Sequence, residues 1–372
     1  MRKGFSLAST WRYFDFWLLG GVLLLVIFGI TMIRSAVAGN IELVELDLVR
    51  RQIIFALIGM GMMLVVTAID YRLWASISRP MYVVTIIVLA TLSIVGSAFF
   101  GSARWFETGV INIQPSEIAK IVLIMVLADF FTRNMEQMGD LRFVGRSFLF
   151  TMGITVWILL QPNLSTSIVM LVLWFAMLWS SGLRLRHLFM FIAAGIVVPI
   201  ASFPFLVEYQ QRRVLNFLFP DPNASYGDIY NIQQALIAIG SGGLLGQGYG
   251  HGTQVQLRFL KVRWSDFIFS AMAQEFGFVG VVAVLVVLGF VIFRCLRAAR
   301  LSTDTFGALL SYGVATMIAF QAVVNIGVNL NLMPATGLTL PFVSYGGSSL
   351  LSSLIGIGLV ESVILRHRTL EF

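Results

Sequence analysis

The sequence predicts an all-α, polytopic membrane protein with about ten transmembrane helices in a single domain, residues 1–372. Of its 372 residues, 58% are hydrophobic and 12% are charged, whereas a soluble domain carries about 25% charged residues. Apolar stretches recur along the whole chain and are long enough to span a hydrocarbon core of about 30 Å. Helices are expected because lipid offers the backbone no hydrogen-bonding partners, and no stretch alternates as a barrel strand does.

Ten segments fit this description of a membrane span. They lie near residues 15–35, 51–69, 75–97, 116–132, 147–161, 165–182, 187–207, 266–293, 306–327 and 340–364. Fifteen lysines and arginines fall at the chain ends and in the even-numbered connections, against four in the short connections of the other side. Since basic residues stay on the cytoplasmic side, both termini are predicted to be cytoplasmic. The net charge of +7 then reflects orientation in the membrane and not nucleic-acid binding.

One connection is much longer than the others. Residues 208–265 join the seventh and eighth spans on the predicted extracytoplasmic face, and connections of this length are usually functional or disordered. The stretch is too apolar for disorder, so we expect short amphipathic helices joined by glycine turns. Its cluster GSGGLLGQGYGHG lacks the Gly-Lys-Ser/Thr of a phosphate loop. Either these glycines let the backbone approach a neighbour closely, or their amides contact an anionic headgroup.

Two charged residues interrupt the fourth span. Pro115 marks a helix start, and Glu117 and Lys120 lie three residues apart, hence on one face of that helix. A charge at the bilayer centre costs about 2.5–3.5 kcal/mol, so such residues normally face the interior of a bundle. The pair is either a structural ion pair or part of a polar cavity that binds something charged.

The eighth span opens with WSDFIFSAMAQEFGFVG, which carries two carboxylates. Asp266 lies at the outer mouth of the span, either as a helix cap or as a functional group. Glu275 follows nine residues later, about 13 Å along a helix and half a turn around it, so the two cannot form a close pair. We expect Glu275 to meet a cation elsewhere, and Lys120 is the obvious candidate.

The segment NLMPATGLTLPFVSYGGSS, which enters the last span, contains two prolines and three glycines. It predicts a broken, re-entrant-like element, which at membrane depth requires protein or a cavity around it. The alternative is a kinked loop that only packs the bundle. One cysteine, Cys295, excludes a disulfide within the chain, and the three scattered histidines lack the spacing of metal ligands.

Five motifs occur in a characteristic order: GSARW, QPSEIAK, AIGSGGLLGQG, SDFIFSAMAQEFGFVG and LPFVSYGGSS. Over nearly the whole chain this order resembles the SEDS family (shape, elongation, division, sporulation), which includes RodA and FtsW. The resemblance implies a peptidoglycan glycosyltransferase of the bacterial cytoplasmic membrane that polymerises lipid II with a class B penicillin-binding protein, a transpeptidase, as its partner. The stretch AIGSGGLLGQGYGHGTQVQLRFL is more similar to RodA, the elongation enzyme that maintains rod shape. The stretch GLTLPFVSYGGSS is also seen in FtsW, the division enzyme, so the division enzyme with the same chemistry is the alternative.

The same resemblance implies roles for individual residues. Asp266 matches the family's essential aspartate, the general base toward the attacking sugar hydroxyl. The implied substrate-binding residues, which would contact the polyprenyl-pyrophosphate-linked sugars, are Arg104, Glu117, Lys120, Arg212, Arg213, Glu275 and Ser344. The cations among them would hold the departing pyrophosphate. No metal-ligand cluster is expected, and assistance by a divalent cation such as Mg²⁺ is left open.

The sequence departs from the family pattern in two places. A stretch that is often Pro-Asp-Leu-Gly in relatives reads PNLS at residues 162–165, which puts an acidic role at Asn163 in doubt. Ahead of Asp266, Lys261 and Arg263 add two cations beside the site. Two other classes of protein are alternatives to a polymerase. One is a lipid II flippase or transporter, because such proteins also contain broken helices and buried charges. The other is a noncatalytic scaffold, in which Asp266 is only a helix cap.

Overall fold

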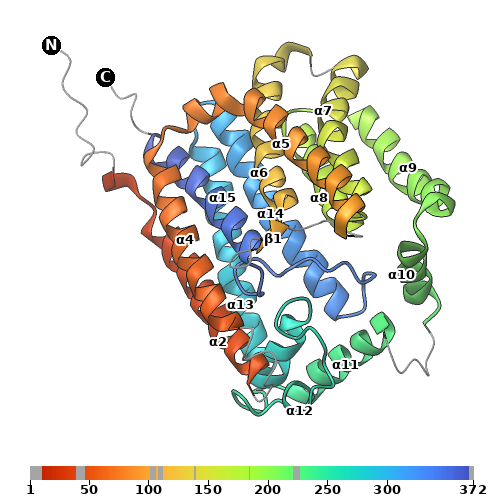
Figure 1. Ribbon diagram of the computed structural model, residues 1–372. Coiled ribbons are helices and arrows are strands. Elements are labelled where there is room, and N and C mark those ends of the chain that lie inside the picture. Colours follow the sequence, from red (N-terminus) through yellow and green to blue (C-terminus); the bar gives the residue numbers. More distant parts are fainter. Residues whose placement is uncertain are drawn as a thin grey trace.

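The computed structural model describes residues 11–38, 47–100, 106–107, 112–137, 140–183, 185–220 and 227–367 (Figure 1). A helix occupies each predicted span: α2 (Phe16–Val37), α4 (Leu48–Ala68), α5 (Tyr71–Phe100), α6 (Pro115–Arg133), α7 (Leu141–Leu160), α8 (Leu164–Ser180), α9 (Leu185–Ser202), α13 (Ile268–Leu301), α14 (Thr305–Asn329) and α15 (Gly347–Leu365). Short elements connect them: η1 (Trp11–Tyr13), η2 (Met135–Gln137), η3 (Phe203–Phe205), and β1 (Phe106–Glu107), which pairs antiparallel with β2 (Asn112–Ile113).

Seven helices within the described residues are long and apolar enough to cross a membrane: α2, α4, α5, α7, α13, α14 and α15. The apolar helix α8 is shorter, with 17 residues. Helix α6 carries four charged residues, Glu117, Lys120, Asp129 and Arg133, which lower its apolar character. The predicted helical architecture with several candidate membrane spans is therefore confirmed, while the count of ten spans, their orientation and the outer position of residues 208–265 stay predictions.

Helices α14 and α15 form the centre of the bundle. α15 packs against α4, α6, α13 and α14. Of the residues in its apolar 18-residue stretch, 89% are buried inside the protein. Its contact with α4 requires a glycine, because a Cβ on Gly358 would lie 2.6 Å from the carbonyl oxygen of Met63. Since protein and not lipid surrounds these central helices, they can carry polar side chains toward a site inside the bundle.

Buried charges tie the helices together at the end of the bundle that holds η1 and the C-terminal end of α15 (Figure 1). Asp15 caps α2, because its Oδ1 accepts hydrogen bonds from the amides of Trp17 and Leu18. Its Oδ2 accepts a hydrogen bond of 2.7 Å from Nε of Arg294 on α13. Its amide donates to Oε2 of the buried Glu361 on α15 at 3.1 Å. This cluster joins the ends of three helices.

Three short helices occupy the predicted long connection: α10 (Glu208–Leu218), α11 (Gly227–Gly242) and α12 (Thr253–Gln256). Figure 1 places α11 and α12 at the opposite end of the bundle from η1. The expectation of short helices joined by glycine turns is confirmed within the described residues, since Gly243, Gly246, Gly248 and Gly250 all have positive φ.

The glycine cluster binds the backbone of α13 where that helix is broken. The break is at Gly277, whose φ of 66° and ψ of −167° are not helical. Four backbone hydrogen bonds of 2.9–3.1 Å join residues 243–248 to residues 274–279. A Cβ on Gly246 would lie 2.2 Å from the carbonyl oxygen of Glu275, so only glycine fits there. Of the two interpretations of the cluster, the close backbone approach is the one that the structure supports.

Candidate active site

A polar cavity of about 640 Å³ opens where several distant segments of the chain meet. Its walls come from the first turns of α4 and α6, the turn between α7 and α8, α10, the turn before α13, and the segment between α14 and α15. It is lined by Arg51, Phe55, Gln114, Glu117, Asn163, Ser165, Thr166, Arg213, Val262, Trp264, Ser265, Asp266, Thr336, Gly337, Leu338, Thr339, Tyr345, Gly346, Gly347 and Ser349. Two carboxylates and two guanidinium groups therefore face one space.

Asp266 lines this cavity from a turn that ends just before α13. Its Oδ1 accepts a hydrogen bond of 2.9 Å from the Ser265 hydroxyl, and its carbonyl oxygen accepts bonds from the side-chain amides of Asn325 (3.1 Å) and Asn329 (2.9 Å) on α14. The N-cap of α13 is Phe267, without a side-chain capping bond. Asp266 is thus held through its backbone carbonyl, lines the cavity and is not the N-cap residue of α13.

Glu117 lines the cavity from the first turn of α6 and bonds to Lys120. The Lys120 Nζ lies 2.7 Å from Oε2 of Glu117, and the Lys120 side chain is fully buried. The Ser352 hydroxyl on α15 donates to the same oxygen at 3.2 Å. Of the predicted pair, only Glu117 is exposed to the cavity, whereas Lys120 supports it from within the bundle.

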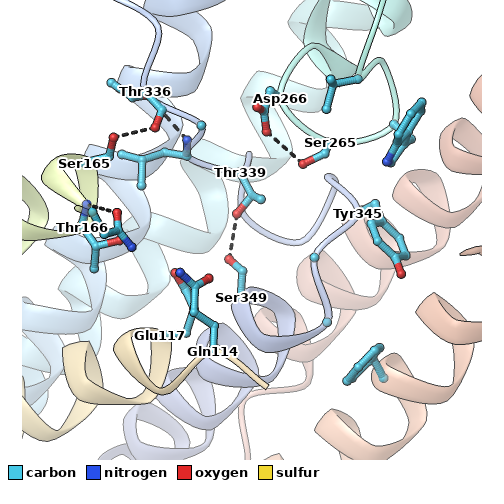
Figure 2. A pocket seen from close by; sticks show the side chains of 18 of the residues that line it. Gln114, Glu117, Ser165, Thr166, Ser265, Asp266, Thr336, Thr339, Tyr345 and Ser349 are labelled. Atoms are coloured by element: carbon cyan, nitrogen blue, oxygen red, sulfur yellow. Dashed lines mark hydrogen bonds between the residues drawn. The ribbon is translucent and has the colours of Figure 1, made fainter. Parts of the chain in front are cut away.

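The broken element between α14 and α15 forms one wall of the cavity. In Figure 2, the hydroxyls of Thr339 and Ser349 lie between Asp266 and Glu117, and they are 2.7 Å apart. The predicted substrate-binding residue Ser344 does not line the cavity. Its buried hydroxyl donates to the carbonyl of Ser265 at 2.7 Å, so it holds the turn that presents Asp266.

Only one of the two adjacent arginines of α10 reaches the cavity. Arg213 is a lining residue. Arg212 is not: its side chain is 70% exposed and pairs with Glu208 one helical turn away, at 2.5 Å. The two residues are about 100° apart around the helix, so they cannot face the same space. Arg104 lies outside the described residues, and its role stays a prediction.

The expected contact between Glu275 and Lys120 is wrong. Lys120 is bonded to Glu117, its neighbour on the same helix. Glu275 is buried beside the glycine cluster, where its Oε1 accepts a hydrogen bond of 2.5 Å from the Ser35 hydroxyl on α2. It does not line the cavity with Asp266, so it belongs to the packing of α2, α13 and the glycine cluster.

The two cations that precede Asp266 do not line the cavity either. Arg263 is buried, and its Nε donates to the carbonyl of Ala36 at the end of α2 at 2.6 Å. Burial, and secondarily the charge of Arg258, lowers the pKa of Arg263. Lys261 is exposed. Arg263 therefore joins the turn before α13 to the end of α2 and is not a substrate contact.

Comparison with known proteins identifies the family. A family model described as "Cell cycle protein", FtsW/RodA/SpoVE, matches residues 16–369. The chain belongs to this SEDS family. It is 34% identical to "Peptidoglycan glycosyltransferase MrdB" of Escherichia coli strain K12 over 351 residues, covering 94% of this chain and 93% of the relative. It is 35% identical to "Probable peptidoglycan glycosyltransferase FtsW" of Trichlorobacter lovleyi over 373 residues, covering 98% and 95%.

Solved structures of similar proteins share the fold of this SEDS protein. One, described as "Structural coordination of polymerization and crosslinking by a peptidoglycan synthase complex", matches with a TM-score of 0.79 and 32% identity, covering 96% of this chain and 99% of the other. The Rod shape determining protein RodA of Thermus thermophilus matches with a TM-score of 0.68 and 30% identity, covering 95% and 97%.

Sequence reasoning missed several residues that the SEDS protein places at the cavity. Arg51 was only one of the four basic residues counted in the short connections of the other side, yet it lines the cavity from the first turn of α4. Tyr345, within the LPFVSYGGSS motif, also lines it, and its amide donates to the carbonyl of Trp264 at 2.9 Å. A tyrosine phenol both donates and accepts hydrogen bonds.

No dedicated metal site is present among the described residues, where no group of three or more acidic, histidine or cysteine side chains could hold an ion. The cavity offers two carboxylates, and that of Glu117 is already bonded to Lys120.

Proposed function

We propose that this protein is a peptidoglycan glycosyltransferase that polymerises lipid II into glycan strands at the outer face of the bacterial cytoplasmic membrane. The observation that carries the proposal is the Asp266 carboxylate in one cavity with the guanidinium groups of Arg51 and Arg213. Membership of the SEDS family and relatives named as peptidoglycan glycosyltransferases support it.

The reaction forms one bond and breaks one. The hydroxyl oxygen of an acceptor sugar attacks the anomeric carbon of a donor sugar, and the bond from that carbon to the pyrophosphate oxygen breaks. The bonding electron pair leaves with the polyprenyl pyrophosphate, and the hydroxyl proton passes to the carboxylate of Asp266. A positioned general base contributes about 10²–10⁴-fold to such a reaction, and one base on the attacking face inverts the anomeric carbon.

Arg51 and Arg213 suit the leaving group. Guanidinium groups bind phosphate oxygens in a bidentate manner and remain charged at any physiological pH. They come from α4 and α10, two elements far apart in sequence that the fold brings to one cavity. Positive charge that is already oriented stabilises developing negative charge without reorganisation.

We further propose that the enzyme acts in cell elongation with a class B penicillin-binding protein as its transpeptidase partner. Support for a partner comes from the similar structure described as a peptidoglycan synthase complex, and support for elongation from the RodA-like stretch AIGSGGLLGQGYGHGTQVQLRFL. The division enzyme is the alternative, because relatives named FtsW are as similar as MrdB. Rescue of rod shape in an elongation-deficient strain, without rescue of a division-deficient strain, tests this assignment.

Polymerisation and translocation are separated by one experiment. Purified protein with its transpeptidase partner is placed in liposomes that contain fluorescent lipid II, and both strand growth and movement of lipid II between leaflets are measured. We expect glycan strands that a muramidase degrades. Translocation without strand growth would show a flippase instead. Neither activity, with a correctly folded protein, would favour a scaffold.

A further inference from the structure

The backbone of the turn that carries Asp266 is held at three consecutive carbonyl oxygens. The carbonyl of Trp264 accepts a hydrogen bond of 2.9 Å from the amide of Tyr345. The carbonyl of Ser265 accepts one of 2.7 Å from the hydroxyl of Ser344. The carbonyl of Asp266 itself accepts two, both from side-chain amides of α14. The end of α14 and the segment between α14 and α15 therefore hold this turn together.

The two amides of α14 belong to Asn325 and Asn329, which lie one turn apart and hence on the same face of the helix. Asn329 is fully buried and uses both ends of its side chain. Its Nδ2 donates to the carbonyls of Asp266 (2.9 Å) and Asn325 (2.8 Å). Its Oδ1 accepts from the amide (3.2 Å) and the hydroxyl (2.6 Å) of Ser270. Asn329 therefore joins α14 to the first turn of α13.

Asn325 makes a different connection, between two walls of the candidate active site. Its Nδ2 donates to the carbonyl of Asp266 at 3.1 Å and to the carbonyl of Leu338 at 2.7 Å. Both acceptor residues line the cavity, whereas Asn325 is buried and does not. The residue before Leu338 lies beside the Asp266 side chain, because a Cβ on Gly337 would be 3.8 Å from Oδ2 of Asp266. One amide group therefore ties Asp266 to the backbone next to its own carboxylate.

A second buried amide on α14 shows what is particular to Asn325. Gln321 lies one turn earlier on the helix, and each of the two residues is 1% exposed. Neither amide atom of Gln321 has a hydrogen-bond partner in the part of the chain that the structure describes. The Oδ1 of Asn325 has no partner there either, so the difference between the two residues is the pair of bonds donated by Nδ2. Removing the amide at 321 therefore changes a buried polar group alone, and removing it at 325 also breaks the link to the cavity.

We propose that Asn325 is a positioning residue for glycosyl transfer and acts through Asp266. By bridging two walls of the cavity, its amide holds the Asp266 carboxylate where it takes the proton of the attacking hydroxyl. This inference rests on the proposed role of Asp266 as the general base. A displacement of about 1 Å at a reacting group costs about 10²-fold in rate. Loss of the bridge should therefore slow the chemical step and leave substrate binding nearly unchanged.

The first test replaces each of the two amides by an apolar side chain of similar size. Lipid II polymerisation by the full-length protein with its transpeptidase partner gives kcat and KM for wild type, Asn325→Leu and the matched control Gln321→Leu. We expect Asn325→Leu to lower kcat at least about ten-fold with KM within about two-fold of wild type. Gln321→Leu should match wild type in both constants. Equal kcat in Asn325→Leu and Gln321→Leu would overturn the inference.

A smaller substitution tests the same turn if Asn325→Leu does not fold. Ser344→Ala removes only the hydroxyl that donates to the carbonyl of Ser265. The loss of one hydrogen bond that holds the turn is expected to lower kcat about two- to ten-fold, again with little change in KM. A wild-type kcat in Ser344→Ala, with Asn325→Leu unfolded, would count against positioning of Asp266 by its backbone.

The second test asks whether Asn325 acts through Asp266. The combined variant Asp266→Asn/Asn325→Leu is expected to have the same residual rate as Asp266→Asn alone, because the group that the bridge positions is already lost. A merely structural defect would instead multiply with the loss caused by Asp266→Asn, and multiplied losses would overturn the inference. Ser344→Ala takes the place of Asn325→Leu in this comparison if the latter does not fold.

The single variant Asp266→Asn keeps this inference separate from the proposed function. If Asp266→Asn polymerises lipid II at a rate near that of wild type, the proposed base fails, and the positioning role fails with it. If Asp266→Asn loses polymerisation while Asn325→Leu keeps the wild-type kcat, the base stands and only the positioning role of Asn325 fails.

Discussion

Replacing Gly246 by alanine tests why residues 240–252 are rich in glycine. Gly246 has φ of +82°, and an alanine Cβ would lie 2.2 Å from the carbonyl oxygen of Glu275. The left-handed backbone costs an alanine about 1–2 kcal/mol. The steric conflict adds about 1–3 kcal/mol, as in overpacked cores, because the nearest atoms are backbone that is itself hydrogen bonded. We therefore expect Gly246→Ala to lower the free energy of unfolding by about 2–5 kcal/mol.

Two neighbouring glycines separate these contributions. Gly250 also has positive φ, +74°, but an added Cβ meets nothing within 4 Å, so Gly250→Ala should lose only the backbone cost of about 1–2 kcal/mol. Gly240 lies inside α11 with open space around it, and alanine there should stabilise the helix by about 0.5–1 kcal/mol. Thermal unfolding of the three variants in detergent, at one scan rate, provides the comparison. If Gly246→Ala unfolds at the same temperature as Gly250→Ala, docking into the break of α13 is not what requires glycine.

Three further predictions concern charged residues. Arg213→Ala should reduce polymerisation about ten-fold or more without lowering thermal stability, whereas Arg212→Ala, its exposed neighbour, should remain near wild type; equal losses would remove Arg213 from the mechanism. Lys120→Met alone should destabilise the protein by about 3–5 kcal/mol, because it leaves a buried carboxylate unpaired. The double variant with Glu117→Gln should be more stable than that single variant in thermal unfolding, and its activity shows whether the pair is only structural. Arg294→Ala should cost about 3–5 kcal/mol without altering the active site, and unchanged stability would contradict the role of the charge cluster at that end.

The helices could be predicted from the sequence because lipid imposes a simple requirement. A segment of about 20 apolar residues must satisfy its own backbone, and hydropathy alone reveals it. The end of α13 was not predicted from the apolar pattern. That pattern predicted a span over residues 266–293, but the helix continues to Leu301. Arg294, Arg297 and Arg300 lie in that extension, where charged side chains are compatible with a helix but not with lipid. Hydropathy therefore located the span and not the end of the helix.

The site was predicted only in part, because tertiary contacts decided the rest. Asp266, predicted at the start of a span, lines the cavity, while its role as the base stays a prediction. The spacing of charged residues along α10 could have distinguished Arg213 from Arg212. Glu208 and Arg212 are four residues apart and pair on the exposed face of the helix, so Arg212 points outward. The burial of Glu275 depends on a glycine segment that docks from elsewhere in the chain, and local pattern carries no signal for that contact.

The measurement that tests the account most directly compares wild type with Asp266→Asn in lipid II polymerisation, each with the transpeptidase partner. Asparagine nearly preserves the shape of the side chain and still accepts a hydrogen bond from Ser265, but it cannot accept the proton of the attacking hydroxyl. We predict that glycan strands disappear, by about 10²-fold or more in rate, while the thermal unfolding temperature is unchanged. Strands that grow at a rate near that of wild type would show that Asp266 is not the base.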